Sequence, residues 1–127
     1  ESTLQWCLEQ PHLRCFVLQQ NMTIIGFAVY ECVLDEATLL NIAINPDMQG
    51  HGCGRKLLRQ SLREVDATIA RIFLEVRISN EAALRLYQSE GLIADGQRRN
   101  YYPTADGRED ARVFELDLDA YRLANQH

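Results

Sequence analysis

The order of apolar and polar residues in the first half of the chain predicts one helix followed by three strands. Residues 2–10 open with a capping box at Ser2–Gln5 and continue as a helical stripe, which predicts a helix that ends at Pro11. Three apolar runs rich in branched side chains then predict strands: 14–19, 24–33 and 38–44. Because short turns at Asn21 and Asp35 separate these runs, we expect two successive hairpins and hence an antiparallel meander.

The second half of the chain alternates between helical and strand patterns. Residues 56–65 predict a helix whose buried face holds Leu57, Leu58, Ser61, Leu62 and Val65. Residues 71–77 predict a strand, and Asn80 and Gly91 are the residue types expected to cap and to close the helix between them. A last pair of strands is expected around a long polar loop: 93–98 and 111–118. The order α-β-β-β-α-β-α-β-β indicates an α/β (α+β) fold with a mixed, mostly antiparallel sheet and helices on both faces.

A glycine-rich segment, Gln49–Arg55, joins the strand 38–44 to the helix 56–65. Glycine adopts positive φ at no steric cost and lets the backbone approach a ligand closely. The unpaired N–H groups and the positive end of the helix dipole then face an anion, which predicts a pyrophosphate-binding loop. A tight glycine turn without a ligand is the alternative.

Two known phosphate loops do not fit this segment. A Walker loop needs a serine or threonine after its Gly-Lys pair, and Leu57 stands in the corresponding place after Gly54–Lys56. The three glycines, at 50, 52 and 54, fall one residue short of the dinucleotide spacing. The Gln-x-x-Gly-x-Gly spacing followed by arginine instead resembles the acetyl-CoA loop of the GNAT acetyltransferases.

Length and composition are those of an ordinary small domain. The 127 residues allow one domain, spanning 1–127, and 46% of them are hydrophobic. No apolar run approaches the roughly 20 residues of a membrane helix, and no signal peptide opens the chain. Four cysteines and three histidines show no metal-ligand spacing, so we expect no metal and a reduced, cytoplasmic setting. The net charge of −5 argues against a nucleic-acid binder and is compatible with a cationic substrate.

Acyl transfer from a thioester to an amine needs a proton acceptor near the amine and a proton donor near the leaving thiolate. Glu75 lies inside an apolar strand, where simple alternation turns it away from Leu74 and Val76, and Tyr87 lies on the helix that follows. Each has an ordinary alternative, because strand glutamates are commonly solvated and helix tyrosines commonly pack. Cys53 at a helix N-terminus would suit an acyl-enzyme route, but no histidine is placed beside it, so we interpret it as part of the loop lining.

Three further stretches resemble the GNAT family: Val33–Ile44, Leu74–Arg77 with Ser79-Asn80, and Arg98–Ala111. The third is the most specific, because the general fold does not require it. The similarity runs from about Ser2 to Leu118 and is strongest to the branch of the family that acetylates the N-terminal alanine of ribosomal proteins. Two departures stand out. The chain opens on the predicted helix, so the family's first strand and helix are expected to be missing. Leu92 also replaces the usual phenylalanine, which we expect to change packing only.

The resemblance implies a role for each candidate residue. Glu75 would be the general base and Tyr87 the general acid. The main chain of Ile42, Ala43 and Ile44 would lie along the pantetheine of acetyl-CoA, Asn80 would contact the same cofactor, and its pyrophosphate would be held by Gly50, His51, Gly52, Cys53, Gly54 and Arg55. Asn80 has a simpler alternative as a helix cap.

The function implied is transfer of acetyl from acetyl-CoA to the α-amine of an N-terminal alanine, with ribosomal protein bS18 as the expected acceptor. The polar segment 98–111 would border the acceptor channel, with Tyr101 and Tyr102 as candidate contacts. Two alternatives stay open: acetylation of lysine side chains or a small amine, and a CoA-binding regulatory module without catalysis. We expect a monomer that binds neither nucleic acid nor membrane.

Overall fold

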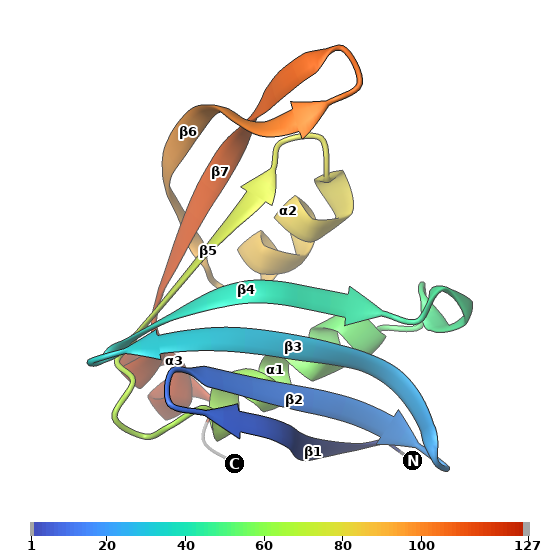
Figure 1. Cartoon of the computed structure of the whole chain (residues 1–127). Helices are drawn as coiled ribbons and strands as arrows, with labels where there is room; N and C mark the ends of the chain where they lie inside the picture. Colours follow the sequence, from blue (N-terminus) through green and yellow to red (C-terminus); the bar gives the residue numbers. More distant parts are fainter. Residues whose placement is uncertain (1, 126–127) are drawn as a thin grey trace. The chain divides into compact units, whose positions relative to one another are not determined.

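The computed structural model describes residues 2–125, and for residues 2–9 it describes the backbone alone. The chain forms two compact units, residues 1–70 and 71–127 (Figure 1). The first unit contains β1 (Ser2–Gln10), β2 (Leu13–Gln20), β3 (Thr23–Val33), β4 (Glu36–Ile44), the short 3-10 helix η1 (Pro46–Met48) and α1 (Cys53–Glu64). The second contains β5 (Arg71–Arg77), α2 (Glu81–Ser89), β6 (Ile93–Thr104), β7 (Gly107–Asp117) and α3 (Leu118–Ala124). Within residues 2–125, no helix is both long and apolar enough to cross a membrane.

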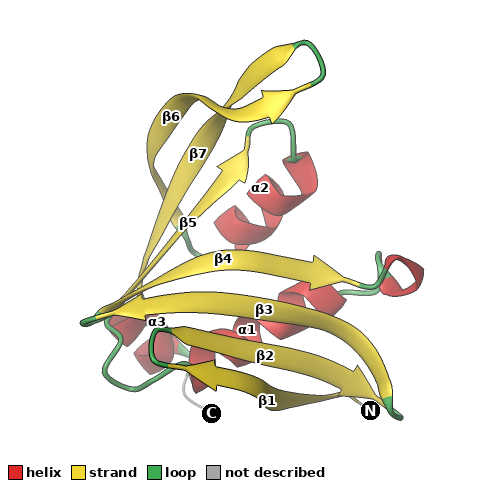
Figure 2. Cartoon of the chain, in the orientation of Figure 1, coloured by secondary structure: helices red, strands yellow, loops and turns green. Residues whose placement is uncertain are grey.

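The first unit is an antiparallel meander, β1–β2–β3–β4, with α1 packed against it (Figure 2). The apolar face of α1 is buried as its periodicity predicts, with Leu57, Leu58 and Leu62 fully covered. The sheet contributes Phe16 and Tyr30, whose rings meet edge to face at 5.9 Å. The hydroxyls of Tyr30 and Ser61 share a buried hydrogen bond of 2.7 Å, so the one polar residue on the buried face of α1 is satisfied.

The second unit is the antiparallel sheet β5–β7–β6, with α2 and α3 in contact with it. Its core is formed by alternate residues of β5, by Ala111, Phe114 and Leu116 of β7, and by Tyr87 of α2. Asn80 caps α2, as expected, and Gly91 takes the left-handed conformation (φ 92°) just after that helix. Leu92, which follows it, is buried.

The prediction of a helix over residues 2–10 is wrong, because these residues form β1. The backbone pairs in antiparallel register with β2, from Ser2 opposite Gln20 to Gln10 opposite Leu13. A capping box is a local signal worth about 1 kcal/mol, whereas a strand partner satisfies the backbone groups along the whole segment. The pairing with β2 therefore outweighs the local preference, and the meander has one strand more than predicted.

The second correction concerns the last pair of strands, which is longer than predicted. We expected a long polar loop between residues 98 and 111, but β6 and β7 continue through it and leave only Ala105 and Asp106 in the turn. Almost every residue of β6 is exposed, so the strand lacks the apolar alternation on which the prediction relied. The chain also ends in α3, which was not predicted. Asp117 caps this helix by accepting the backbone N–H of Ala120 at 3.0 Å.

One glycine of the first unit is needed for the approach of β3 to β4. A Cβ on Gly26 would lie against the carbonyl oxygen of Ala43 and 2.7 Å from Cδ1 of Ile44. We expect Gly26→Ala to destabilise the chain by about 1–3 kcal/mol, as overpacking does elsewhere, and to lower the melting temperature by several degrees. Gly96→Ala is the matched control, since its Cβ would meet only Val113 Cβ at 3.9 Å. Equal melting temperatures for the two variants would show that the close approach is not a constraint.

Candidate active site

The glycine segment has the backbone geometry that the sequence predicts. Asn45 caps η1 by accepting the backbone N–H of Asp47 at 3.0 Å, and the Gln49 side chain donates to the carbonyl of Ile44 at 3.3 Å. Gly50 and Gly52 then adopt left-handed φ values of 84° and 76°, which a residue with a Cβ rarely takes. Gly52 is the N-cap of α1 and has no side chain with which to cap it. The first-turn N–H groups of α1 therefore receive no side-chain cap from this position and suit an anion.

A row of cations continues from this loop along the exposed side of α1. A groove of about 310 Å³ is lined by Gly52, Arg55, Lys56, Arg59, Gln60 and Arg63. Four of these side chains are cationic, in a chain whose net charge is −5. Sequence reasoning named Arg55 alone and missed the other three. The four-residue spacing of Arg55, Arg59 and Arg63, which places them on one helix face, is the signal that could have found them.

The end of β4 lies in the same unit as the loop. Ile42, Ala43 and Ile44 are half-buried and pair with Ala28, Phe27 and Gly26 of β3. An apolar pocket of about 280 Å³ lies beside them and is lined by Ile24, Ile25, Gly26, Phe27, Ala43, Ile44, Asn45 and Pro46. His51 is exposed in the loop, and Cys53 is the half-buried first residue of α1, with a free thiol.

Glu75 lies on β5, and the strand turns it away from the core. Its neighbours Leu74 and Val76 are buried, with 1% and 7% exposure, while Glu75 is on the other face, as alternation predicts. The carboxylate is held by Arg98 of β6, whose Nε lies 2.8 Å from Oε1. The guanidinium of Arg98 also lies 5.4 Å from the ring centroid of Tyr101. Arg98 reaches Glu75 diagonally across β7, whose Val113 pairs with Glu75 and with Gly96.

Three tyrosines gather around this glutamate or its strand. Tyr87 on α2 is buried, with its ring 5.8 Å from that of Phe114, and burial, followed by the nearby Tyr102, raises its pKa to about 12. The hydroxyl of Tyr102 donates to the main-chain oxygen of Glu75 at 3.3 Å, and desolvation raises its pKa. Interaction with the Glu75 carboxylate raises the pKa of Tyr101. All three phenols are therefore protonated at neutral pH and can act as proton donors.

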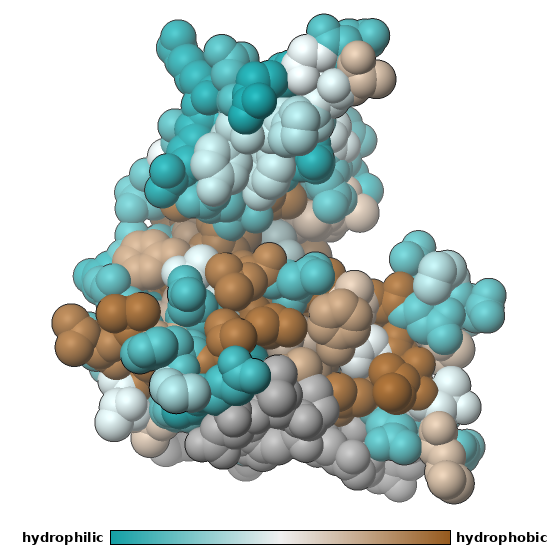
Figure 3. Space-filling model, viewed as in Figure 1, coloured by the Kyte–Doolittle hydropathy of each residue, from teal (hydrophilic) through white to brown (hydrophobic). Residues whose placement is uncertain are grey.

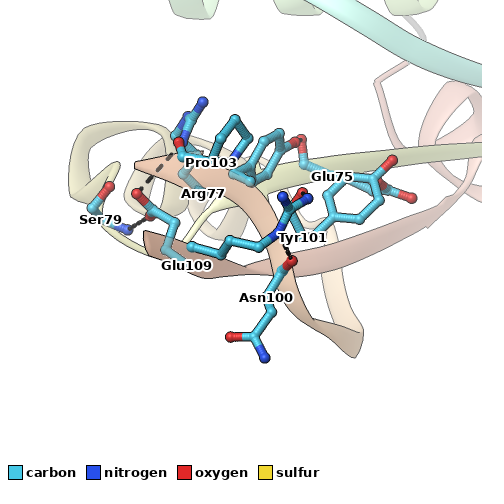
Figure 4. A network of polar contacts seen from close by, with 9 residues as sticks. Glu75, Arg77, Ser79, Asn100, Tyr101, Pro103 and Glu109 are labelled. Carbon is cyan, nitrogen blue, oxygen red and sulfur yellow. Dashed lines mark hydrogen bonds and ion pairs between the residues drawn. The ribbon is translucent and has the colours of Figure 1, made fainter. Parts of the chain in front are cut away.

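Ionic contacts fasten the hairpin of β6 and β7 to the end of β5 (Figure 4). The guanidinium of Arg77 lies 4.4 Å from the ring centroid of Tyr102, donates to the carbonyl of Pro103 at 3.0 Å and pairs with Glu109 at 3.5 Å. Glu109 also accepts the backbone N–H of Ser79 at 3.1 Å. Hydrogen bonding with Ser79, first from its side chain and then from its backbone, lowers the pKa of Glu109. No local spacing in the sequence predicts these contacts or the Arg98–Glu75 pair, because they join separate strands.

The predicted site residues thus fall into two sets. The first unit holds residues 42–44 and 50–55, and the second holds Glu75, Asn80 and Tyr87. In the second unit, β5 and the hairpin of β6 and β7 also bring Glu75 together with three residues outside this set: Tyr101, Tyr102 and Arg98. The Oδ1 of Asn80 accepts the backbone N–H of Ala83 at 3.1 Å, so the side chain acts as the helix cap that was its simpler interpretation. Asn80 itself is exposed.

Comparison with known proteins gives a consistent result. Residues 1–92 match the model of the acetyltransferase (GNAT) family. The [ribosomal protein bS18]-alanine N-acetyltransferase of Escherichia coli is 50% identical over 104 residues, which cover 81% of this chain and 70% of that protein. The protein of the same name from Haemophilus influenzae is 46% identical over 99 residues, 76% of this chain and 67% of its own length.

Solved structures agree with the sequence comparison. The crystal structure of the ribosomal-protein-S18-alanine N-acetyltransferase from Escherichia coli has a TM-score of 0.81 at 47% identity, covering 87% of this chain and 72% of that one. A spermidine/spermine N-acetyltransferase from Vibrio cholerae has a TM-score of 0.82 at 21% identity, covering 91% and 72%, and shows the shared fold. The chain belongs to the acetyltransferase (GNAT) family.

Proposed function

We propose that this chain transfers the acetyl group of acetyl-CoA to the α-amine of an N-terminal alanine, and that the acceptor is ribosomal protein bS18. The observation that carries the proposal is the 50% identity, over 81% of the chain, to a protein named for that reaction. A carboxylate surrounded by protonated phenols on the hairpin supports it, because this is the chemistry that amine acylation requires. Ribosomal proteins are made in the cytoplasm, so we place the reaction there.

We assign cofactor binding mainly to the first unit. The backbone of Gly50–Arg55 would hold the pyrophosphate at the N-terminus of α1, and the main chain of Ile42–Ile44 would lie along the pantetheine. The cations of the α1 groove add a positive field for a ligand that carries several phosphate charges. Asn80, exposed at the start of α2, would contribute a polar contact from the second unit.

The proposed reaction is a direct transfer. The neutral amine attacks the thioester carbonyl, its nitrogen forms a bond to the acetyl carbon, and its proton passes to Glu75 directly or through a water. The C–S bond then breaks, and Tyr87 protonates the thiolate and later recovers its proton from solvent. A peptide α-amine, with a pKa of about 7.7–8.0, becomes neutral far more readily than a lysine at about 10.4, so no separate device is needed to deprotonate it.

The contacts of Glu75 suggest how the amine reaches it. The side chain of Arg98 is 58% exposed, so its guanidinium can rotate into solvent and leave one carboxylate oxygen to the incoming amine. The hydroxyl of Tyr102 can stay on the main-chain oxygen of Glu75, 3.3 Å away, during this exchange and keep that part of β5 in place.

The loop assignment is tested by an isosteric pair at Gly52. Asparagine and aspartate both tolerate the left-handed φ of 76° that this position requires, and they differ essentially in charge. We expect Gly52→Asp to bind acetyl-CoA at least tenfold more weakly than Gly52→Asn, a difference of about 1.4 kcal/mol, because its carboxylate would face the phosphates. Calorimetry on the two folded variants measures the difference. Equal affinities of the two variants for acetyl-CoA would show that this loop does not bind the pyrophosphate.

The two proton-transfer residues are tested by variants that keep the shape of the site. Glu75→Gln should lower turnover by roughly 10²–10⁴ and leave acetyl-CoA affinity unchanged, because only the proton acceptor is lost. Tyr87→Phe keeps the ring that packs on Phe114 and should also lower turnover. Since the pKa of Tyr87 is about 12, its hydroxyl stays protonated at lower pH. Tyr87→Phe should therefore lower the rate by the same factor across the pH range and leave the pKa values of the pH–rate profile unchanged. Cys53→Ala is the control and should keep its activity. Wild-type turnover in Glu75→Gln and Tyr87→Phe would contradict their roles in proton transfer and would indicate that both residues are structural.

The acceptor is tested with two versions of one basic peptide that begins with alanine. The version with a free N-terminus should be acetylated at its α-amine, as mass spectrometry would show. The version with a blocked N-terminus and free lysines should react poorly, because a lysine is almost fully protonated at neutral pH. Faster reaction of the blocked peptide would show that the chain acetylates lysine side chains and not the α-amine of alanine.

A further inference from the structure

The solvent side of α1 concentrates positive charge in a chain whose net charge is −5. The helix contains four cations, Arg55, Lys56, Arg59 and Arg63, and a single acidic residue, Glu64 at its last position. Because an α-helix turns by about 100° per residue, the four cations lie within an arc of roughly 100°. The leucines of the same helix are buried against the meander. The cations therefore form one stripe along the exposed side.

This placement is unfavourable for the helix by itself. Arg55 and Arg59, and likewise Arg59 and Arg63, are four residues apart, and like charges at this spacing repel each other. Arg55 and Lys56 also lie in the first turn, where the positive end of the helix dipole disfavours cations, and this turn contains no acidic residue. A local arrangement that costs stability is expected at functional sites, where a ligand supplies the missing negative charge.

The stripe lines a groove that begins at the glycine loop. The groove has a volume of about 310 Å³, and its lining also includes Gln60 and Gly52, the left-handed N-cap of α1. At about 30 Å³ per water molecule, this volume would hold about ten waters. It is therefore large enough for a phosphate group together with part of its hydration shell. The groove is also continuous with the N–H groups to which we assign the pyrophosphate.

The meander presents a different kind of surface from α1. The face of the sheet that lies away from α1 is turned toward the viewer in Figure 3 and shows apolar patches among polar side chains. The large exposed apolar residues of this unit all lie outside α1: Met22, Ile24, Val33, Leu34 and Leu40. A ligand that carries several negative charges is therefore drawn to the α1 side of the unit.

Acetyl-CoA carries a phosphate that the loop assignment leaves without a partner. Besides its pyrophosphate it has a separate 3′-phosphate on the ribose, and such a monoester carries between one and two negative charges at neutral pH. The ribose separates the two groups by a distance comparable to one turn of an α-helix, about 5.4 Å. With the pyrophosphate at the N-terminus of α1, the 3′-phosphate can reach the second turn, where Arg59 lies.

We propose that Lys56, Arg59 and Arg63 bind the 3′-phosphate of acetyl-CoA, so that this chain distinguishes acetyl-CoA from its 3′-dephospho form. Arginine and lysine both make charge-assisted hydrogen bonds to phosphate oxygens. The inference rests on the part of the proposed function in which the loop before α1 holds the pyrophosphate of acetyl-CoA. It does not depend on the acceptor or on the residues that transfer protons.

The site is tested by calorimetry with two ligands, acetyl-CoA and 3′-dephospho-acetyl-CoA. The wild-type chain should bind the dephospho form roughly tenfold more weakly, because exposed ion pairs contribute a few-fold each and three cations are involved. The difference between the two affinities should narrow as salt is added, since the contacting groups are close to solvent and are screened.

Variants of the groove should act on one ligand and not on the other. The double variant Arg59→Gln/Arg63→Gln should bind acetyl-CoA roughly tenfold more weakly and bind the dephospho form as the wild type does, because the two changes remove the same interaction. Gln60→Glu keeps the shape of the groove and adds a negative charge, so it should also weaken acetyl-CoA more than the dephospho form. Arg99→Gln, which removes an exposed cation from β6, is the control and should change neither affinity.

Thermal unfolding separates ligand binding from a structural role of the cations. Lys56→Gln removes a positive charge from the first turn of α1, where the dipole opposes it, so its melting temperature should be no lower than that of the wild type. Its affinity for acetyl-CoA should nevertheless fall. A lower melting temperature with unchanged affinity would show that Lys56 stabilises the helix and does not bind the phosphate.

The outcomes separate this inference from the proposed function. Equal affinities of the wild-type chain for the two ligands, or equal losses of both in the double variant, would overturn the 3′-phosphate site. The comparison of Gly52→Asp with Gly52→Asn would still test the loop, and the alanine peptide would still test acetyl transfer. A chain that distinguishes the two ligands as expected but does not acetylate the peptide would retain the phosphate site and lose the proposed acceptor.

Discussion

The ion pair between Arg98 and the Glu75 carboxylate is the interaction on which the proposed chemistry of the second unit depends. A carboxylate on a strand whose neighbouring residues are buried is costly unless it has partners. β5 supplies none of them. They come from β6, which contributes Arg98 to the side chain and Tyr102 to the main chain. The hairpin is therefore part of the site, and its conformation sets the direction of the carboxylate.

This dependence explains the polar character of the hairpin. An apolar hairpin could be held by burial, but it would offer no donors to a carboxylate. The hairpin is tied to the end of β5 by Arg77, Glu109 and Ser79. Its register shifts between Arg98 and Tyr102, and this bulge is held by Arg108 and Asp110, which bond the backbone of Asn100. Charged hydrogen bonds replace a hydrophobic core in specifying the backbone, and they leave the surface free to meet a polar substrate.

Under the proposed function, the first unit has a different physical task, which is to bring main chain close to the phosphates of acetyl-CoA. Gly50 and Gly52 supply two left-handed residues before α1, and Gly26 lets β3 approach the end of β4 without a clash. The cations of α1 lie on its solvent side, while its apolar side is buried against the meander. One helix thus contributes both to the core and to the positive field.

Local sequence determined the parts of the protein whose signal lies within a few residues. The left-handed glycines of the loop and the buried face of α1 follow from conformational freedom and helical periodicity, although α1 begins at Cys53, three residues before the predicted range 56–65. The direction of Glu75 follows from strand alternation between Leu74 and Val76. The cap at Asn80 follows from its side-chain oxygen. In each case the physical cause is a property of consecutive residues.

Tertiary structure decided the features that need a partner from elsewhere in the chain. Residues 2–10 are a strand because β2 pairs with them, against a local helical signal. The exposed strand β6 lacks the alternation of apolar and polar residues that predicts a strand. Its strand conformation and its bulge follow from its pairing with β7. The Arg98–Glu75 pair and the hydrogen bond from Tyr102 to the Glu75 main chain depend on that register, since a slip along the ladder would move both side chains away from Glu75. The sequence by itself determined which residues could do the chemistry, and strand pairing decided which of them meet, because contacts between strands depend on register and not on spacing along the chain.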